Sequence, residues 1–370
     1  MTRVFRRLAS LAASLALMAT LLPPSTQASE IVDMRGRTVE VPDEIDKLSI
    51  DDGRYLVALS LLVPDPVDLL AAWPRDINRL GRASYERYRE AFPALDGLPS
   101  VASSADNFDI ESVLAAAPDV AVVSLGRGPT DAQVAQLQAA GIAVVFIDFF
   151  TDPLEHQSRS LRILGRLTGH ESQAEAYLAF RREHLERISA RLGDDTPAPS
   201  VFLEAHAGIT NDCCFSAGNG GVGQYIDFVG GHNIGADVLD RASGKLSLEY
   251  VIASDPDVYI ATGGPDLQRS DGLVLGGEVD AATARESLER VTQRPGIAQL
   301  TAVKTGNVHG LAHQLLNSPL DIVAIEAFAR WIHPQRFADI DPGVTLETIN
   351  RRFLAVPYEG TGWIDLAASR

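Results

Sequence analysis

Arginine and aromatic side chains in this sequence have types and positions that suit recognition of a flat, anionic ligand. Arg54, Arg82 and Arg127 each lie where we expect a strand to give way to a loop. Arginine offers a planar cationic fork to anionic oxygens, and aromatic rings present apolar faces. The aromatic residues near these arginines are Tyr55, Tyr85 and Phe149. We therefore expect these six side chains to contact one ligand in one cleft.

Histidines form a second group with chemistry of its own. His206 closely follows the apolar run 201–203, which places it best among His206, His309 and His313 at the end of a strand. Because a neutral imidazole ligates transition metals, His206 is a candidate direct metal ligand, although such histidines are more often structural. His313 and Asn317 precede a helix expected from about residue 319, and they are candidate hydrogen-bonding partners of the ligand. We predict no metal site made by the protein alone.

Catalytic and nucleotide-binding motifs give no support for an enzyme. The sequence lacks G-x-S-x-G, H-E-x-x-H and the P-loop pattern. Gly218, Gly220 and Gly223 fit G-x-G-x-x-G, but the residues before them do not form a strand that runs into the turn. We expect no catalysis and no resident cofactor; a secreted α/β hydrolase is the alternative from a different class.

Short apolar runs alternate with helical patterns along the chain. The runs 120–123, 144–147, 201–203 and 258–261 are rich in β-branched residues, as buried parallel strands are. The pattern at 131–140 predicts a helix that ends at Gly141. This alternation predicts an α/β fold with parallel sheets. Ligands of such sheets bind beyond the carboxyl ends of the strands, which is where the arginines and histidines lie.

One segment of the chain occurs twice, 138 residues apart. Residues 109–123 and 247–261 share Glu, Val, Ala and Pro-Asp-Val in register. Each copy predicts a helix capped by Asp109 or Ser247, then a proline turn and a strand. The repeat indicates two related lobes. Glu111 and Glu249 occupy equivalent places in it, in the first turn of a helix, where an acidic side chain interacts favourably with the helix dipole.

The division of the chain follows from these elements. We expect a first lobe at 29–150, a linker at 151–195 and a second lobe at 196–370. Apolar residues at helical spacing predict one long helix at about 171–192 inside the linker.

The first 28 residues have the composition of an export signal. Arg3, Arg6 and Arg7 precede the apolar stretch 8–22, and small residues lead to Ala28. This layout predicts a secretory leader cleaved near Ala28. The net charge of −17 becomes −20 without the leader, which carries three arginines and no acidic residue. Such a charge excludes nucleic-acid binding through a basic surface.

Cys213 and Cys214 are adjacent, and they are the only cysteines of the chain. Export places them in an oxidising compartment, where free thiols are uncommon. We expect a vicinal disulfide that stiffens the loop 211–215 at the mouth of the cleft. Free thiols and thiolate ligation of a metal stay open as alternatives. Asn211 and Phe215 of this loop are candidate ligand contacts.

The exported precursor, the paired E-x-(hydrophobic)₂-A-x-x-P-D-V segments and the helical connector together resemble the periplasmic binding proteins of ABC importers for ferric siderophores, haem and cobalamin. The resemblance covers about residues 31–360 and includes the segments 230–236, 288–300 and 304–309. It departs at 50–55, where the family has a serine-rich opening. No single branch of the family therefore assigns the ligand.

The resemblance implies a fold and a function. It implies two Rossmann-like lobes with mainly parallel sheets, joined by one long α-helix, with the ligand cleft between them. It also implies a periplasmic monomer that captures a ferric siderophore and docks on an ABC permease through Glu111 and Glu249. His206 would then be a candidate ligand of the iron. Haem or cobalamin is the alternative ligand within the same class.

Overall fold

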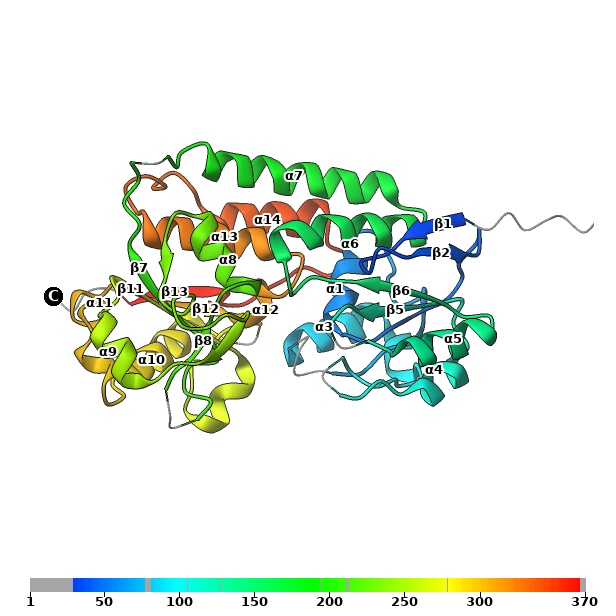
Figure 1. The fold of residues 1–370 in the computed structure, drawn as a ribbon, viewed down its shortest axis with the longest axis horizontal. Coiled ribbons are helices and arrows are strands. Elements are labelled where there is room, and N and C mark those ends of the chain that lie inside the picture. The colour runs from blue at the N-terminus through cyan, green and yellow to red at the C-terminus, as the bar shows by residue number, and fades with distance from the viewer. Residues whose placement is uncertain are drawn as a thin grey trace, which may run out of the picture.

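The computed structural model describes residues 29–366 except for residues 77–80, 105, 127, 194, 211–212 and 278. In this part of the chain, two α/β lobes lie side by side, and helices run along one side of them (Figure 1). No helix among these residues is both long and apolar enough to cross a membrane. The leader expected at 1–28, Arg127 and Asn211 lie outside the described residues.

A parallel sheet of four strands forms the centre of the first lobe, in the order β4-β3-β5-β6. The strands β5 and β6 are continuous apolar runs because helices and loops cover both faces. An antiparallel hairpin of β1 and β2 accompanies the sheet, and β2 packs against β6. The elements of this lobe are β1 (Ser29–Val32), β2 (Thr38–Val41), β3 (Leu48–Ile50), α1 (Arg54–Ser60), β4 (Leu70–Ala72), α3 (Arg82–Ala91), η1 (Pro93–Gly97), α4 (Ile110–Ala116), β5 (Val120–Ser124), α5 (Asp131–Ala139) and β6 (Ala143–Ile147).

A mixed sheet forms the centre of the second lobe. Its path is β10-β8-β7-β11-β12-β13, and β9 pairs with β7. The central strands β7, β11 and β12 are parallel, while β8, β10 and β13 pair in the antiparallel sense. The strands are β7 (Ser200–Glu204), β8 (Phe215–Ala217), β9 (His232–Asn233), β10 (Ser243–Lys245), β11 (Val258–Gly263), β12 (Val308–Ala312) and β13 (Trp363–Leu366). The helices are η2 (Gly221–Gly223), α8 (Gln224–Phe228), α9 (Leu248–Ser254), η3 (Pro265–Ser270), α10 (Ala281–Thr292), η4 (Ile297–Gln299), α11 (Thr301–Thr305), α12 (His313–Leu316), α13 (Asp321–Ile332) and α14 (Pro342–Arg352).

The repeated segment has the same structure in both lobes. The Asp109 carboxylate accepts hydrogen bonds from backbone N–H groups at the start of α4, and the Ser247 hydroxyl does so at the start of α9. Each helix has seven residues and ends at a residue in the left-handed conformation, Ala117 or Asp255. A proline and the strand β5 or β11 follow. The predicted caps, helices and strands of the repeat are therefore all present.

The connection between the lobes contains two helices, where the sequence analysis expected one. They are α6 (Pro153–Leu167) and α7 (Glu171–Ser189), and α7 packs against α6 and α13 (Figure 1). The additional helix α6 begins at Pro153, whose fixed φ suits the first helical turn. After α14 the chain also returns to the first lobe, where the backbone N–H of Ala355 donates to the carbonyl of Ser60 at 3.0 Å.

This architecture confirms the predicted fold class, a two-lobed α/β protein with parallel strands at the centre of each sheet. The apolar core follows both sheets and continues under α6, α7 and α13. The carboxyl ends of the central strands carry the residues considered next.

Candidate ligand cleft between the two lobes

An inner cavity of about 230 Å³ lies between the lobes. Arg54 reaches it from the first lobe, and all its other lining residues come from the second lobe. The second-lobe residues follow the carboxyl ends of β7, β11 and β12, as expected for an α/β sheet. They are His206, Gly263, Gly264, Asp266, His313 and Gln314.

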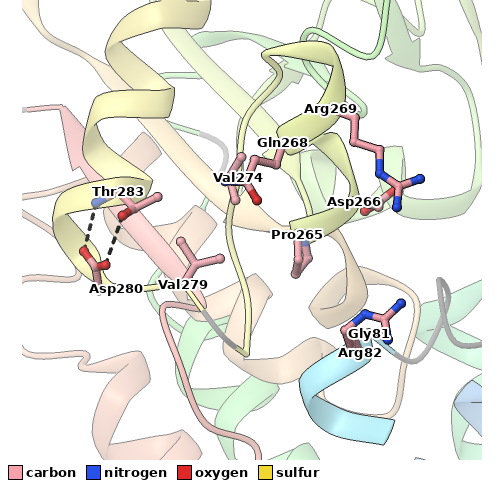
Figure 2. A pocket seen from close by; sticks show the side chains of 10 residues that line it. All are labelled: Gly81, Arg82, Pro265, Asp266, Gln268, Arg269, Val274, Val279, Asp280 and Thr283. Atoms are coloured by element: carbon pink, nitrogen blue, oxygen red, sulfur yellow. Dashed lines mark hydrogen bonds between the residues drawn. The ribbon is translucent and has the colours of Figure 1, made fainter. Parts of the chain in front are cut away.

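An outer cavity of about 490 Å³ shares Asp266 with the inner one (Figure 2). Arg82, at the start of α3, lines it from the first lobe, and Arg269 of η3 lines it from the second. In Figure 2 both guanidinium groups lie on the same side of the cavity. Neither arginine has an ion-pair partner among the described residues. Each lobe therefore brings one arginine to the outer cavity, whose lining also includes the carboxylates of Asp266 and Asp280.

Arg54 enters the inner cavity as part of an ion pair. Its Nε and Nη2 donate to the two carboxylate oxygens of Asp52 at 2.8 and 2.7 Å. Its guanidinium carbon lies 3.8 Å from the centre of the Phe150 ring, within the range of a cation–π contact. Asp52 is fully buried, and the Arg54 side chain is 15% exposed. Asp52 thus compensates the charge of Arg54, while Phe150 and Asp52 fix its orientation.

His206 and His313 face each other in the inner cavity, with ring centres 3.9 Å apart. Asn317 Nδ2 lies 2.9 Å from His313 Nε2, and Thr262 Oγ1 lies 2.9 Å from His313 Nδ1. If Asn317 donates to Nε2, the His313 proton is on Nδ1, where it donates to Thr262. The Thr262 hydroxyl also accepts the backbone N–H of His206 at 3.1 Å. Thr262 of β11 therefore links both histidines, because β11 lies between β7 and β12 in the sheet.

Both histidines are held uncharged in this cavity. Burial lowers the pKa of His313 well below its usual value, and His206 and Arg54 lower it further. Burial also lowers the pKa of His206, although Asp266 opposes the shift. Two neutral imidazoles are therefore the expected state at neutral pH.

Two aromatic residues expected in the cleft lie in the core instead. Tyr55 and Phe149 are each 1% exposed, and their rings pack 5.7 Å apart. The Tyr55 hydroxyl shares a hydrogen bond of 2.7 Å with the Ser124 hydroxyl, which in turn bonds Asp51 at 2.9 Å. The expectation that Tyr55 and Phe149 contact the ligand is wrong for this structure, because both side chains turn into the first lobe. Phe150, next in the chain, is the aromatic residue beside Arg54.

Other predicted residues have structural partners. Tyr85 stacks on Trp73 with ring centres 5.9 Å apart and donates its hydroxyl hydrogen to Asp96. Asn317 supports His313 and is not among the lining residues of the inner cavity. His309 bonds Asp365 at 2.8 Å and stacks on Trp331, which assigns it to the packing of the second lobe.

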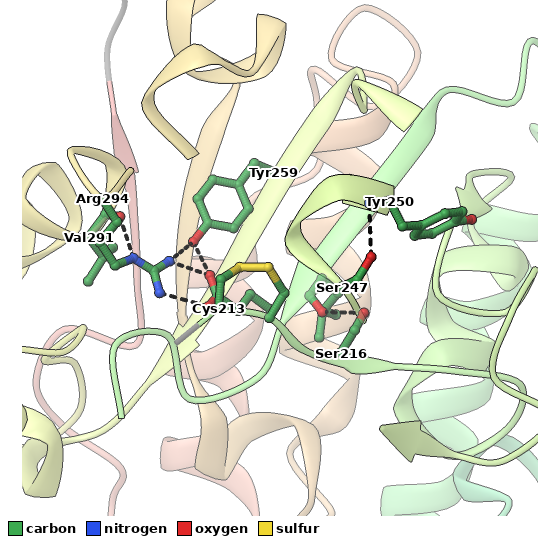
Figure 3. The surroundings of a disulfide bond; sticks show 10 residues. Cys213, Ser216, Ser247, Tyr250, Tyr259, Val291 and Arg294 are labelled. Carbon is green, nitrogen blue, oxygen red and sulfur yellow. Dashed lines mark hydrogen bonds and ion pairs between the residues drawn. A yellow bond between two sulfur atoms is a disulfide. The ribbon is translucent and has the colours of Figure 1, made fainter. Parts of the chain in front are cut away.

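The adjacent cysteines form a disulfide at the base of the loop that follows β7 (Figure 3). Cys214 is buried, whereas Phe215 beside it is 45% exposed. Tyr259 and Arg294 lie near Cys213 in Figure 3, and Arg294 binds the Glu204 carboxylate at 2.8 and 2.5 Å. Phe215 does not line either cavity. The ion pair fixes Glu204, the last residue of β7, where this loop begins, and the disulfide lies where the loop ends.

Glu111 and Glu249 are both exposed, on α4 and α9. Figure 1 shows these helices on the side of the molecule away from α7. Each lobe therefore carries one exposed acidic residue on a helix that lies on this side of the molecule.

Several lining residues escaped the sequence analysis. Asp266 and Arg269 belong to the short helix η3, and Gln314 follows His313 in α12. No spacing pattern in the sequence marks these positions. Their signal is their place, because they follow closely after the carboxyl ends of predicted strands. Asp52 did carry a signal, because an acidic residue two positions before Arg54 can bond it locally.

Comparisons with known proteins agree with this geometry. The family model described as "Periplasmic binding protein" matches residues 59–315. A cobalamin-binding protein of Halobacterium salinarum is 30% identical over 225 residues, which make up 60% of this chain and 54% of the relative. This chain thus spans about half the length of that relative.

Solved structures show the same fold. The TroA-like periplasmic binding protein FepB of Veillonella parvula has a TM-score of 0.81 at 24% identity, covering 91% of this chain and 99% of its own. The molybdate-binding MolA of Haemophilus influenzae has a TM-score of 0.68 at 18% identity, and the match covers 90% of this chain and 99% of MolA. The family match extends over more than half of the sequence and spans both lobes. This chain belongs to the periplasmic binding protein family.

Proposed function

We propose that this protein captures a ferric siderophore in the cleft between its lobes and delivers it to an ABC-type permease in the inner membrane. One observation carries the proposal: Arg54 of the first lobe and His206 and His313 of the second line the same cavity. The outer cavity adds Arg82 and Arg269, whose charges suit anionic oxygens of a ferric chelate. The family consists of binding proteins, which agrees with capture and not with catalysis.

Delivery requires export and a docking surface. The leader at residues 1–28 supports export to the periplasm, with cleavage near Ala28. The exposed Glu111 and Glu249 support docking, because one acidic group on each lobe suits basic side chains on a permease. We propose that the mature chain acts as a monomer without a resident cofactor.

Cobalamin is a second candidate ligand. The observation that favours it is the 30% identity to a protein named for cobalamin binding. Haem belongs to the same set of metal chelates with a flat ring. The neutral imidazoles of His206 and His313 suit all three ligands.

A fluorescence titration distinguishes these ligands. Tryptophans lie in both lobes, Trp73 in the first and Trp331 and Trp363 in the second, so binding between the lobes is expected to quench their emission. The purified mature protein is titrated with ferric siderophores, haemin and cyanocobalamin. Saturable quenching by a ferric siderophore is expected. Saturation by haemin or cyanocobalamin alone would assign the ligand to the second candidate.

A further inference from the structure

The second lobe touches helix α3 of the first lobe at Gly277. A Cβ at this position would lie 2.9 Å from the Ala83 Cβ, closer than real Cβ contacts come, and 3.3 Å from Nη2 of Arg87. The neighbouring Gly276 donates its N–H to the Thr361 carbonyl at 2.8 Å, which ties this part of the second lobe to the segment before β13. The close approach of the two lobes therefore requires a glycine at 277.

An ion pair joins the lobes beside this contact. Arg87 of α3 donates through Nη1 to Oε2 of Glu359 at 3.1 Å, and Glu359 lies on the segment that leads into β13. The Glu359 side chain is 64% exposed, so water weakens the pair. Burial raises the pKa of the adjacent Tyr358, and the charge of Arg87 opposes that rise. Arg87 is thus held against the second lobe by a contact that is weak enough to break.

The guanidinium of Arg87 also has an unfavourable side. Its Nε and Nη2 atoms are buried, and neither makes a hydrogen bond within the part of the chain that the structure describes. A buried donor without an acceptor costs free energy because its bonds to water are lost. Separation of the lobes returns Nη2 to water, since Gly277 lies against it. The closed and open arrangements are therefore close in free energy.

The helix of this contact also lines the outer cavity. Arg82, the first residue of α3, faces the cavity from the first lobe, and Asp280 lines it three residues after Gly277 (Figure 2). In Figure 1, α3 lies at the edge of the first lobe that faces the second, while α7 runs along the opposite side of the molecule. Contact at α3 therefore encloses the outer cavity, and separation there opens it.

We propose that Ala83 and Arg87 of the first lobe and Gly277 and Glu359 of the second form a clasp that opens and closes the outer cavity. A ligand that contacts both lobes binds the closed state better and shifts the balance toward it. The closed clasp then delays release of the ligand. Opening and closing is a property of the protein alone, whereas the delay rests on the proposed function.

The distance between the lobes tests the clasp without any ligand. The variant A132C/A253C carries spin labels at exposed positions of α5 and α9, one in each lobe. The native cysteines form a disulfide and take no label. Pulsed electron resonance then gives the distribution of distances between the two labels, which lengthens when the lobes separate.

Charge variants in this labelled background test the ion pair of the clasp. E359R places a like charge against Arg87, and R87E/E359R restores opposite charges. E347R is the matched control, because Glu347 pairs with Arg351 within α14. We expect a shift to longer distances in E359R alone, with the distribution of the wild type in R87E/E359R and E347R.

A wedge at Gly277 tests the steric half of the clasp. G277V brings a branched side chain against Ala83, and we expect it to shift the distances as E359R does. G97V is the matched control, because a Cβ at Gly97 meets no atom within 4 Å. The distances in G97V should equal those of the wild type.

Release of ferrioxamine B, an iron(III) chelate used here as the probe, tests the delay. Its dissociation rate constant is measured by stopped-flow fluorescence. We expect release at least about fivefold faster from E359R and G277V than from the wild type, since coupled equilibria commonly differ by this factor or more. The rate from R87E/E359R should match that of the wild type.

The outcomes separate the inference from the proposed function. Unchanged distances in E359R and G277V would overturn the clasp, whatever the chelate does. Longer distances with an unchanged rate of release would overturn the delay. Failure of the wild type to bind ferrioxamine B would count against the proposed function and the delay together, while the distances still decide whether the clasp closes. Unfolding curves check that the variants fold as the wild type does.

Discussion

Arg54 and Asp52 form a bidentate ion pair at the wall of the inner cavity, with N–O distances of 2.8 and 2.7 Å. Asp52 is fully buried, and its carboxylate also accepts a hydrogen bond from the Ser104 hydroxyl at 2.8 Å. The carboxylate of Asp52 therefore offsets the positive charge that Arg54 brings to the wall of the inner cavity. The other two arginines of the cleft, Arg82 and Arg269, line the outer cavity together with Asp266 and Asp280.

Replacement of Arg54 tests how much its ion pair with Asp52 stabilises the folded protein. R54Q removes the bidentate guanidinium from the buried Asp52 carboxylate, and we expect the free energy of unfolding to fall by about 3 kcal/mol. R82Q is the matched control, since Arg82 is exposed and has no ion-pair partner among the residues described; its change is expected within about 0.5 kcal/mol. Urea unfolding measures both. Equal losses in the two variants would contradict the role assigned to the pair.

Asp51, beside this pair, predicts a pH dependence of stability. Burial raises the pKa of Asp51 from its ordinary value of 3.8 to about 7, and the nearby Asp52 charge adds to the shift, although bonds from Ser124 oppose it. Between these values the folded state keeps a proton that the unfolded state has lost. The free energy of unfolding therefore falls as the pH rises from about 4 to 7 and then levels off.

The variant D51N tests that dependence. An asparagine can make the hydrogen bonds of the protonated carboxyl: its oxygen accepts from the Ser124 N–H and its amide donates to the Ser124 hydroxyl. We expect D51N to lose the fall between pH 4 and 7 and to be more stable than the wild type at pH 8. Thermal unfolding at a series of pH values measures this, and parallel curves for the two proteins would refute it.

A second buried ion pair fixes the connecting helix to the second lobe. Arg181 of α7 donates to Asp321 of α13 at 2.9 and 2.6 Å, and both side chains are buried. D321N leaves a buried guanidinium without its anion, so we expect a loss of about 3–5 kcal/mol. E175Q breaks the exposed pair with Arg162 and is expected to cost less than about 1 kcal/mol. Denaturant unfolding compares the two, and a small loss in D321N would show that the pair contributes little.

The docking proposal makes a prediction that separates transport from binding. The double variant E111A/E249A removes the acidic group from both lobes, and we expect uptake of the radiolabelled iron chelate to be abolished in cells that carry it. The dissociation constant for the chelate should not change, because neither glutamate lines the cavities. E183A, which removes an exposed glutamate of α7, is the control and should leave uptake intact. Weaker chelate binding by the double variant would show that these glutamates serve the cleft or the fold.

Local signals made much of the fold predictable. Asp109 and Ser247 cap their helices as their residue types suggest, and the proline after each helix ends it before a buried strand. These interactions span only a few residues, so the sequence pattern contains them. The helix α6 was missed because its charged surface and short apolar stripe resemble a linker.

The cleft was less predictable, because its contacts depend on orientation and on strand order. Successive helical residues point in directions about 100° apart, so Arg54 reaches the cavity while Tyr55 turns into the core. His206 and His313 are 107 positions apart, and they meet because β11 lies between β7 and β12. Arg269 lies on a short helix for which the sequence offers no pattern.

Calorimetric titration of cleft variants tests the central claim, that one anionic chelate is held between the lobes. R82A and R269A each remove an exposed arginine of the outer cavity, one from each lobe. A charge-assisted hydrogen bond is worth about 1.5–3 kcal/mol. We therefore expect one chelate per chain and at least about tenfold weaker binding in both variants, with R182A on the surface of α7 unchanged. If only one of R82A and R269A, or neither of them, bound the chelate more weakly than the wild type, the claim would be contradicted.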